Sequence, residues 1–191
     1  FAEVYAEYSK DNRIGYADRK IETVANKIIS GVGIRGFLGT RTYFASTTDL
    51  TPSGLRECAR RVAQAVGNPV DRIADFSLVE RINPNIHPIA INPFDVSAGV
   101  RCGLIREAAD AAWAAGDEII QVNGTLLTSD KSFTVANSEG LYTSDRQIRT
   151  RMMVTAIGSD GSRNEQGIAS PGSQMGLEFF DIDRFQPERI G

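Results

Sequence analysis

The hexapeptide Gly31–Gly36, GVGIRG, matches the G-x-G-x-x-G pattern of dinucleotide-binding loops, and its flanks decide the fold class. A Rossmann loop has a strand before the glycines and a helix directly after them, where the pyrophosphate binds. Here Gly36 is followed by Phe37, a turn at Gly39–Thr40 and the β-like residues 41–46. This order argues against nucleotide binding and predicts a glycine-containing strand with a return strand. In such a strand the glycines allow β-bulges or a close approach of the backbone to its neighbours.

Alternation of apolar and polar residues predicts further strands on both sides of this run. Residues 1–8 have the pattern of a half-exposed strand, and residues 12–26 are typical of a hairpin with its turn at 17–20. In the second half, short polar turns between β-like runs predict an antiparallel meander. Its expected strands are 118–128, 132–138 and 141–158, and its expected turns are 129–130, 139–140 and 160–161.

Apolar periodicity and capping residues indicate one helix near the start of the chain. It is expected over 52–66, with Thr51 or Asp49 as the N-cap, Pro52 in the first turn and Gly67 at its end.

A second helix is expected over 93–115, although Gly99 and Gly103 weaken its first half and leave a later start open. The proline-rich stretch before it contains one short expected strand, 76–80. We therefore predict an α+β fold with two α/β subdomains, each a mostly antiparallel sheet with one main helix. The expected organisation is an N-terminal domain 1–68, a connector 69–92 and a second domain 93–191.

Charge and composition argue against several classes of protein. The formal net charge is −3, whereas a dedicated nucleic-acid binder needs an excess of cations. No apolar run approaches the roughly 20 residues that cross a bilayer, and no signal-peptide core is present. Cys58 and Cys102 lie far apart in helix-like segments, which favours buried thiols in a reducing compartment over a disulfide. We expect a cytoplasmic protein with no membrane partner and no direct nucleic-acid partner.

The chain contains a single histidine, His87, between prolines in the expected connector. A mononuclear zinc hydrolase usually needs two or three histidine ligands, so His87 is interpreted as a connector or surface residue. No catalytic, cofactor-binding or metal-binding residue is therefore assigned within this chain.

Two groups of charged residues allow a functional and a plainer interpretation. Arg146, Arg149 and Arg151 lie on one expected strand, where Arg149 and Arg151 share a face. They fit a phosphate or peptide-carboxylate contact, but a solvated face paired with acids such as Asp145 is favoured. Glu107 and Asp110 share a helix face and are interpreted as surface carboxylates in preference to a general acid and base.

Two segments rich in small residues also allow a functional and a plainer interpretation. Ser46, Thr47 and Thr48 precede the first helix, and helix capping explains them better than a nucleophilic serine, because the one histidine lies far along the chain. The glycine-rich segment 166–176 is predicted to be a loop. It fits a substrate-contacting lid and a connector between β elements equally well.

Three segments together resemble the TldD/PmbA family, whose members were once described as modulators of DNA gyrase. Residues 31–63 contain a glycine-punctuated strand, a return strand ending in FAS, and DLT before an arginine-rich helix. Residues 135–172 resemble the family's middle region, where an NS-G hairpin precedes a long strand. MGLEFF, residues 175–180, is more similar to the TldD branch than to the PmbA branch.

The resemblance implies a zinc metallopeptidase that acts on unfolded or modified peptides as a homodimer or a TldD–PmbA heterodimer. Its zinc would be held by a His-Glu-x-x-x-His helix, a motif absent from these 191 residues. We therefore expect the chain to be the non-catalytic N-terminal part of a longer hydrolase that shapes the substrate chamber and the dimer. The zinc is expected in the C-terminal half. The alternative is a PmbA-type partner or assembly module without peptidase activity.

Overall fold

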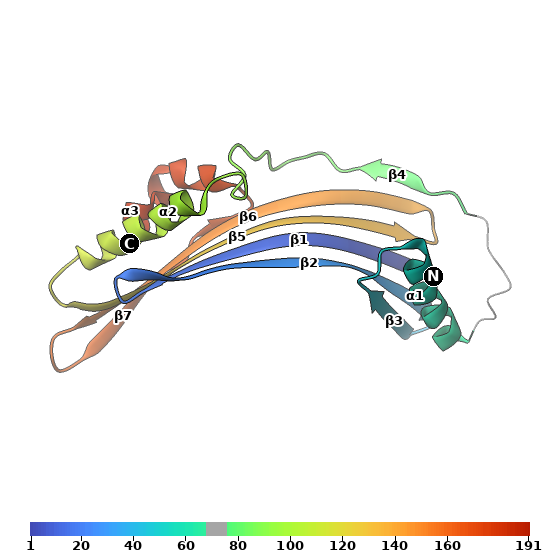
Figure 1. The fold of residues 1–191 in the computed structure, drawn as a ribbon, viewed down its shortest axis with the longest axis horizontal. Helices are drawn as coiled ribbons and strands as arrows, with labels where there is room; N and C mark the ends of the chain where they lie inside the picture. Colours follow the sequence, from blue (N-terminus) through green and yellow to red (C-terminus); the bar gives the residue numbers. More distant parts are fainter. Residues whose placement is uncertain (68–75) are drawn as a thin grey trace. The chain divides into compact units, whose positions relative to one another are not determined.

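The computed structural model describes residues 1–67 and 76–191, and their fold is α+β, as predicted. Long strands dominate it, and α1 and α2 are the two main helices (Figure 1). The strands are β1 (Ala2–Ala17), β2 (Lys20–Leu38), β3 (Arg41–Thr47), β4 (Val79–Ile82), β5 (Ile119–Asn137), β6 (Leu141–Ser159), β7 (Asn164–Ala169) and β8 (Gly172–Ser173). The helices are α1 (Pro52–Val66), α2 (Ala98–Trp113) and α3 (Pro187–Ile190), with 3₁₀ turns at Leu177–Asp181 and Asp183–Phe185.

The strands form a mostly antiparallel sheet in the order β3-β2-β1-β5-β6-β4, and β7 and β8 also pair with β6. β2 pairs with β3, and β6 with β7 and β8, all antiparallel. The exception is β4, which lies parallel to the first residues of β6, from Val79 opposite Leu141 to Ile82 opposite Ser144. The predicted mostly antiparallel fold with one main helix in each half is thus confirmed.

The described residues group into two compact units, each assembled from three segments. Unit 1 consists of Phe1–Ser9, Ile28–Asn85 and Lys131–Arg146, and contains α1. Unit 2 consists of Lys10–Lys27, Ile86–Asp130 and Gln147–Gly191, and contains α2. β1, β2, β5 and β6 therefore contribute residues to both units. The division at residues 68 and 92 stays a prediction, and residues 68–75 of the expected connector lie outside the described residues.

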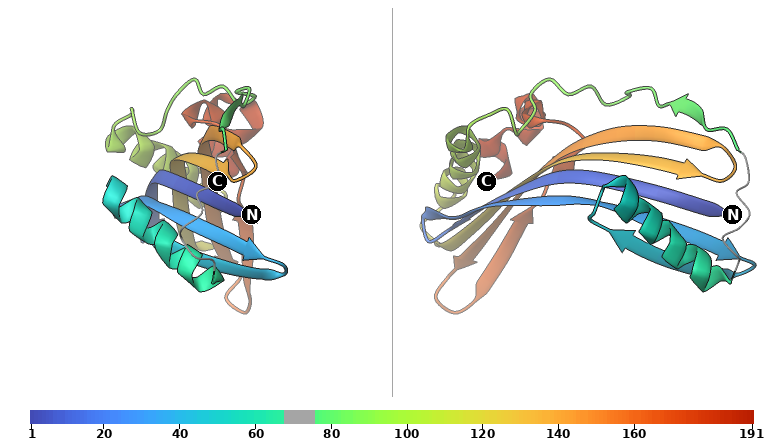
Figure 2. Two further views of the ribbon diagram at one scale, coloured as in Figure 1. Left: turned by 90° about the vertical axis from the view of Figure 1, so that its right-hand side faces the viewer. Right: turned by 45° about the vertical axis from the view of Figure 1, so that its right-hand side comes forward.

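In unit 1, α1 begins and ends where its capping residues predict. The Thr51 hydroxyl accepts a hydrogen bond from the Gly54 N–H at 3.2 Å, and Gly67 closes the helix with φ 80°. The helix lies against β3 (Figure 2). Its buried residue Val62 packs with Val32 and Ile34 of β2. A Cβ on Gly36 would lie 2.8 Å from Cγ1 of Val62. The last glycine of GVGIRG is thus a packing residue in a strand, as expected.

In unit 2, α2 begins at Ala98, five residues after the predicted start. Ser97 is its N-cap and accepts a hydrogen bond from the N–H of Val100 at 3.4 Å. Before it, the side chain of Asn92 accepts from the N–H of Phe94 at 3.0 Å, which forms an Asx turn. The expected start at residue 93 falls within this proline-containing turn, and the helix begins at the later position that Gly99 and Gly103 leave open. The buried residues of α2 are Arg101, Ile105, Ala108, Ala109 and Ala112.

Several predicted strand boundaries are wrong, whereas the hairpin turns at 17–20, 39–40, 139–140 and 160–161 are confirmed. β5 continues through Ser129–Asp130, where a turn was predicted, and β1 joins the segments predicted as separate strands. Polar turn-forming residues are tolerated there because a strand with one solvated face accepts them.

The glycine-rich segment 166–176 is not a continuous loop, since it contains the end of β7 and all of β8. The strand expected over 76–80 occurs at Val79–Ile82 as β4. Within 1–67 and 76–191, no helix is long and apolar enough to cross a membrane.

Candidate functional site

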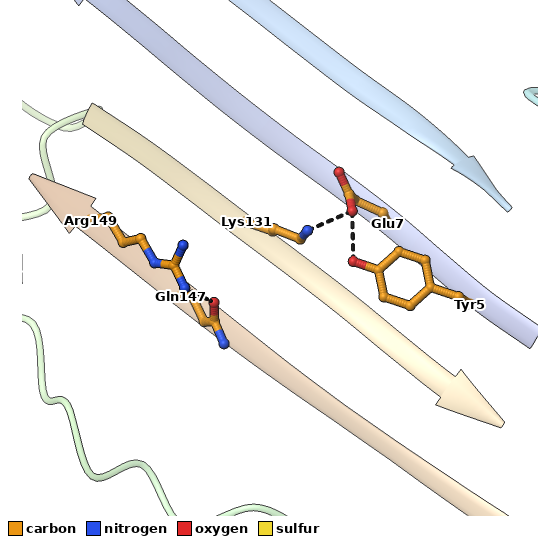
Figure 3. A network of polar contacts seen from close by, with 5 residues as sticks. All are labelled: Tyr5, Glu7, Lys131, Gln147 and Arg149. Carbon is orange, nitrogen blue, oxygen red and sulfur yellow. Dashed lines mark hydrogen bonds and ion pairs between the residues drawn. The ribbon is translucent and has the colours of Figure 1, made fainter. Parts of the chain in front are cut away.

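A polar network joins β1 and β5 in unit 1. Oε2 of Glu7 accepts a 2.6 Å hydrogen bond from the Tyr5 hydroxyl and lies 2.7 Å from the Lys131 ammonium (Figure 3). The ring of Tyr5 stacks on Phe133 with centroids 5.8 Å apart. These side chains alternate along their strands and therefore share one face of the sheet.

The shared carboxylate shifts the ionisation of all three groups. Hydrogen bonds from Lys131 and then Tyr5 lower the pKa of Glu7 below its ordinary value of 4.5. The pKa of Lys131 is raised, chiefly by its hydrogen bond to Glu7. Burial raises the pKa of Tyr5, and its hydrogen bond to Glu7 adds to the rise. Near neutral pH the network is a carboxylate, an ammonium and a neutral phenol, and it links β1 to β5.

Unit 2 contains a pocket of about 370 Å³ on the sheet, which we name the cationic pocket. It is lined by residues 11–13 of β1, 25–27 of β2, 127–129 of β5, and Arg149 and Arg151 of β6. Burial along β6 alternates strictly here, so the two arginines are exposed on one face. A second hollow of about 370 Å³, which includes Ser170, Ser173 and Gln174, shares both arginines.

The two arginines make hydrogen bonds to neutral side chains. Nη2 of Arg149 donates to Oε1 of Gln147 at 2.8 Å (Figure 3), and Nε of Arg151 donates to the Ser170 hydroxyl at 3.0 Å. Both arginines lie on an exposed face, as the favoured interpretation expects, whereas these two hydrogen bonds are made to neutral side chains and not to acids. Arg149 and Arg151 do share a face, as predicted, whereas Arg146 belongs to unit 1.

The other residues singled out by sequence lie apart from these sites. His87 lies in an exposed stretch between β4 and α2, and Glu107 and Asp110 are exposed on α2, as the plainer interpretation expects. Ser46 and Thr47 end β3 and do not cap α1. Thr47 instead accepts a hydrogen bond from the N–H of Asp49 at 3.0 Å.

Cys58 and Cys102 are free thiols, buried in α1 and half-buried in α2. In the described part of the chain, no three His, Cys, Asp or Glu side chains are grouped to hold a metal ion. The residues present do not fit a zinc site, and no zinc ligand is assigned to them.

The sequence analysis did not identify the network of Tyr5, Glu7 and Lys131. It also did not identify Arg13 and Lys27 as residues that line the cationic pocket. Their signal is faint, because alternate polar positions on a strand are the ordinary pattern of a solvated face. Only the pairing of β1 with β2 and β5 brings these side chains together.

Comparison with known proteins gives two family matches that follow the chain in order. Residues 2–66 match PmbA/TldA metallopeptidase domain 1, and residues 91–191 match the PmbA/TldA metallopeptidase central domain.

Curated relatives agree with these matches. The Metalloprotease TldD homolog of Haemophilus influenzae is 22% identical over 94% of this chain and 38% of its own length. A protein named Metalloprotease from Methanothermobacter thermautotrophicus is 26% identical over 100% of this chain and 41% of its own. The chain thus spans about two fifths of the length of these relatives.

Solved structures share the fold. A candidate modulator of DNA gyrase from Bacteroides thetaiotaomicron superposes with a TM-score of 0.73 at 12% identity, over 91% of this chain and 41% of that one. TldE from Thermococcus kodakarensis superposes with a TM-score of 0.68 at 15% identity, over 91% and 40%. Since the two family models together account for most of the sequence, the chain belongs to the PmbA/TldD metallopeptidase family.

Proposed function

We propose that this chain is the non-catalytic N-terminal part of a zinc metallopeptidase that cleaves unfolded or modified peptides. It shapes one wall of the substrate chamber and helps to hold a dimer in the cytoplasm. The observation that carries the proposal is the pair of metallopeptidase family matches. The His-Glu-x-x-x-His motif is absent from these 191 residues. The zinc and its ligands then belong to polypeptide beyond the two matched domains.

An exposed strand segment in unit 2 supports a role in holding extended peptides. Among the described strands, β3 pairs only with Val32–Leu38 of β2, so Lys20–Lys27 carries an edge without a neighbouring strand on that side. Val24 on this segment is 47% exposed. A strand edge offers main-chain donors and acceptors to any extended peptide, whatever its sequence. This fits a substrate that is unfolded.

The test uses the full-length protein and an unfolded peptide labelled for cleavage. We expect cleavage that a zinc chelator abolishes, and slower amide exchange over Lys20–Lys27 when a non-cleaved peptide is bound. If the full-length protein does not cleave the peptide with or without added metal, the proposed peptidase activity is refuted. Cleavage without protection anywhere in residues 1–191 would remove the role in substrate binding.

The sequence that follows Gly191 in the gene separates the TldD-type enzyme from the PmbA-type partner. A His-Glu-x-x-x-His motif there supports the enzyme. Its absence, together with cleavage that requires a second subunit, supports the partner role. Sedimentation of the full-length protein alone and with that subunit then distinguishes a homodimer from a heterodimer.

A further inference from the structure

The cationic pocket concentrates positive charge on a chain whose net charge is negative. Arg13, Lys27, Arg149 and Arg151 line it together with one acid, Asp11. The local balance is four cations against one carboxylate, or +3, whereas the whole chain carries −3. Gathering like charges is unfavourable unless an anion or solvent compensates them. The pocket is therefore suited to an anionic ligand.

Arg149 and Arg151 are held in place without losing their charge. Each donates one hydrogen bond to a neutral acceptor, Gln147 and Ser170 respectively. A guanidinium has five N–H donors, so each keeps donors for a carboxylate in addition to its net charge. The stem of Arg151 also lies close over Gly172, where a Cβ would be 3.0 Å from Cγ of the arginine. Such orientation lowers the entropy cost of binding.

The spacing of the two arginines matches an extended peptide. They stand two residues apart on one strand, which separates their Cα atoms by about 6.6 Å. Acidic side chains at alternate positions of an extended peptide have the same spacing. Each arginine also borders both hollows, so one peptide can place one carboxylate at each guanidinium.

The rest of the pocket favours a peptide over a small inorganic anion. Leu127 is 39% exposed in the lining, beside the aliphatic stems of the basic residues. These carbons offer a surface for the methylene groups of acidic side chains. Residues 25–27 belong both to the pocket and to the exposed edge of β2.

We propose that the cationic pocket selects acidic peptides, with the carboxylates of an acid-x-acid segment pairing with Arg149 and Arg151. This rests on the proposed peptidase function and adds its substrate class. The two arginines determine specificity and take no part in bond cleavage.

The experiment measures binding of two matched fluorescent peptides to the full-length protein by anisotropy. One contains Glu-Val-Glu and the other Gln-Val-Gln. We expect the acidic peptide to bind at least about tenfold more tightly at low salt, with the difference shrinking as salt screens the charges. The double variant Arg149→Gln/Arg151→Gln should lose most of this preference, although Arg13 and Lys27 remain in the lining.

A matched control removes the same charge elsewhere. Arg56→Gln/Arg60→Gln changes two exposed arginines on α1 and should keep the acidic preference. Circular dichroism melting of each variant checks its folding. If the control loses the preference equally, or both peptides bind the unaltered protein alike, the proposal is wrong. Tighter binding of a single-stranded oligonucleotide, lost in the pocket variant, would also overturn it.

Cleavage assays separate this proposal from the proposed function. Cleavage of both peptides at equal rates, unchanged in the pocket variant, would refute acidic selection and leave the peptidase standing. A protein that binds the acidic peptide selectively through the two arginines but cleaves neither would support the pocket and refute the peptidase.

Discussion

Gly124 of β5 lies directly against Ile105 of α2. A Cβ on this glycine would be 2.9 Å from both Cγ1 and Cδ1 of the isoleucine, which is fully buried. The absence of a side chain lets the helix pack on the backbone of the strand. This contact positions α2 over the core of unit 2. Further along, β5 also lines the cationic pocket.

Gly124→Ala should therefore destabilise the protein. The added methyl group forces Ile105 to shift in a close-packed core, which typically costs about 1–3 kcal/mol. The measurement is the free energy of unfolding in urea. Gly167→Ala is the matched control, because a Cβ there would meet nothing within 4 Å. Equal stability of the two variants would contradict the close approach.

Glu7→Gln should lower stability in a pH-dependent manner. The folded-state pKa of Glu7 is lowered. Ionised Glu7 therefore contributes fully to the free energy of unfolding above pH 4.5, its ordinary pKa, and this contribution is lost as the pH falls through the folded-state pKa. The pKa of Lys131 is raised, so its contribution is complete below 10.5 and is lost as pH rises through its folded value.

The loss in Glu7→Gln should accordingly be largest between these limits and shrink in acid. Both side chains are partly exposed, so the loss is about 1 kcal/mol or less. Unfolding in urea across pH measures it. Glu57→Gln, which breaks the more exposed pair with Arg61, should cost less. A loss that does not change with pH would argue against the shared carboxylate.

Glu178→Gln should loosen the segment before α2. The two oxygens of Glu178 accept from the N–H groups of Ile91 and Gly176, each at 2.9 Å. Burial opposes ionisation of Glu178, but these backbone donors outweigh it and lower its pKa. The amide can accept through only one atom, which leaves a donor unpaired at about 1–2 kcal/mol.

The pKa of Glu178 is lowered, so its ionised carboxylate stabilises the folded state fully above pH 4.5. The loss of stability in Glu178→Gln should therefore shrink as the pH falls through the folded-state pKa. Hydrogen exchange at Ile91 and Gly176 reports the local effect. The control Glu188→Gln changes an exposed carboxylate on α3 and should leave these amides protected. Unchanged exchange in Glu178→Gln would contradict the predicted role.

Thr51→Ala should destabilise α1 by about 1 kcal/mol, because the hydroxyl satisfies the N–H of Gly54. Thr51→Ser keeps the hydroxyl and should retain most of the stability. Thermal unfolding compares the three proteins. If serine and alanine lower the melting temperature equally, the capping bond does not contribute.

The parts of the fold that follow local rules could be predicted from sequence. Thr51, Pro52 and Gly67 bound α1 because capping depends only on neighbouring residues. The turn at Asp18–Arg19, with both φ values positive, lies inside the expected hairpin. The start of α2 could be placed only within a range, because Asn92 forms a turn that resembles a helix start and Gly99 and Gly103 leave a later start open.

The sequence by itself determined the family, the antiparallel α+β class and the shared face of Arg149 and Arg151, since each depends on motif order or on the two-residue repeat of a strand. Tertiary structure decided the continuity of β1 and β5, the parallel pairing of β4, and the meeting of Arg13 and Lys27 with those arginines. The physical reason is that strand pairing is non-local. Hydrogen bonds between strands that are distant in the sequence determine which solvated side chains become neighbours, and no short stretch of sequence contains that information.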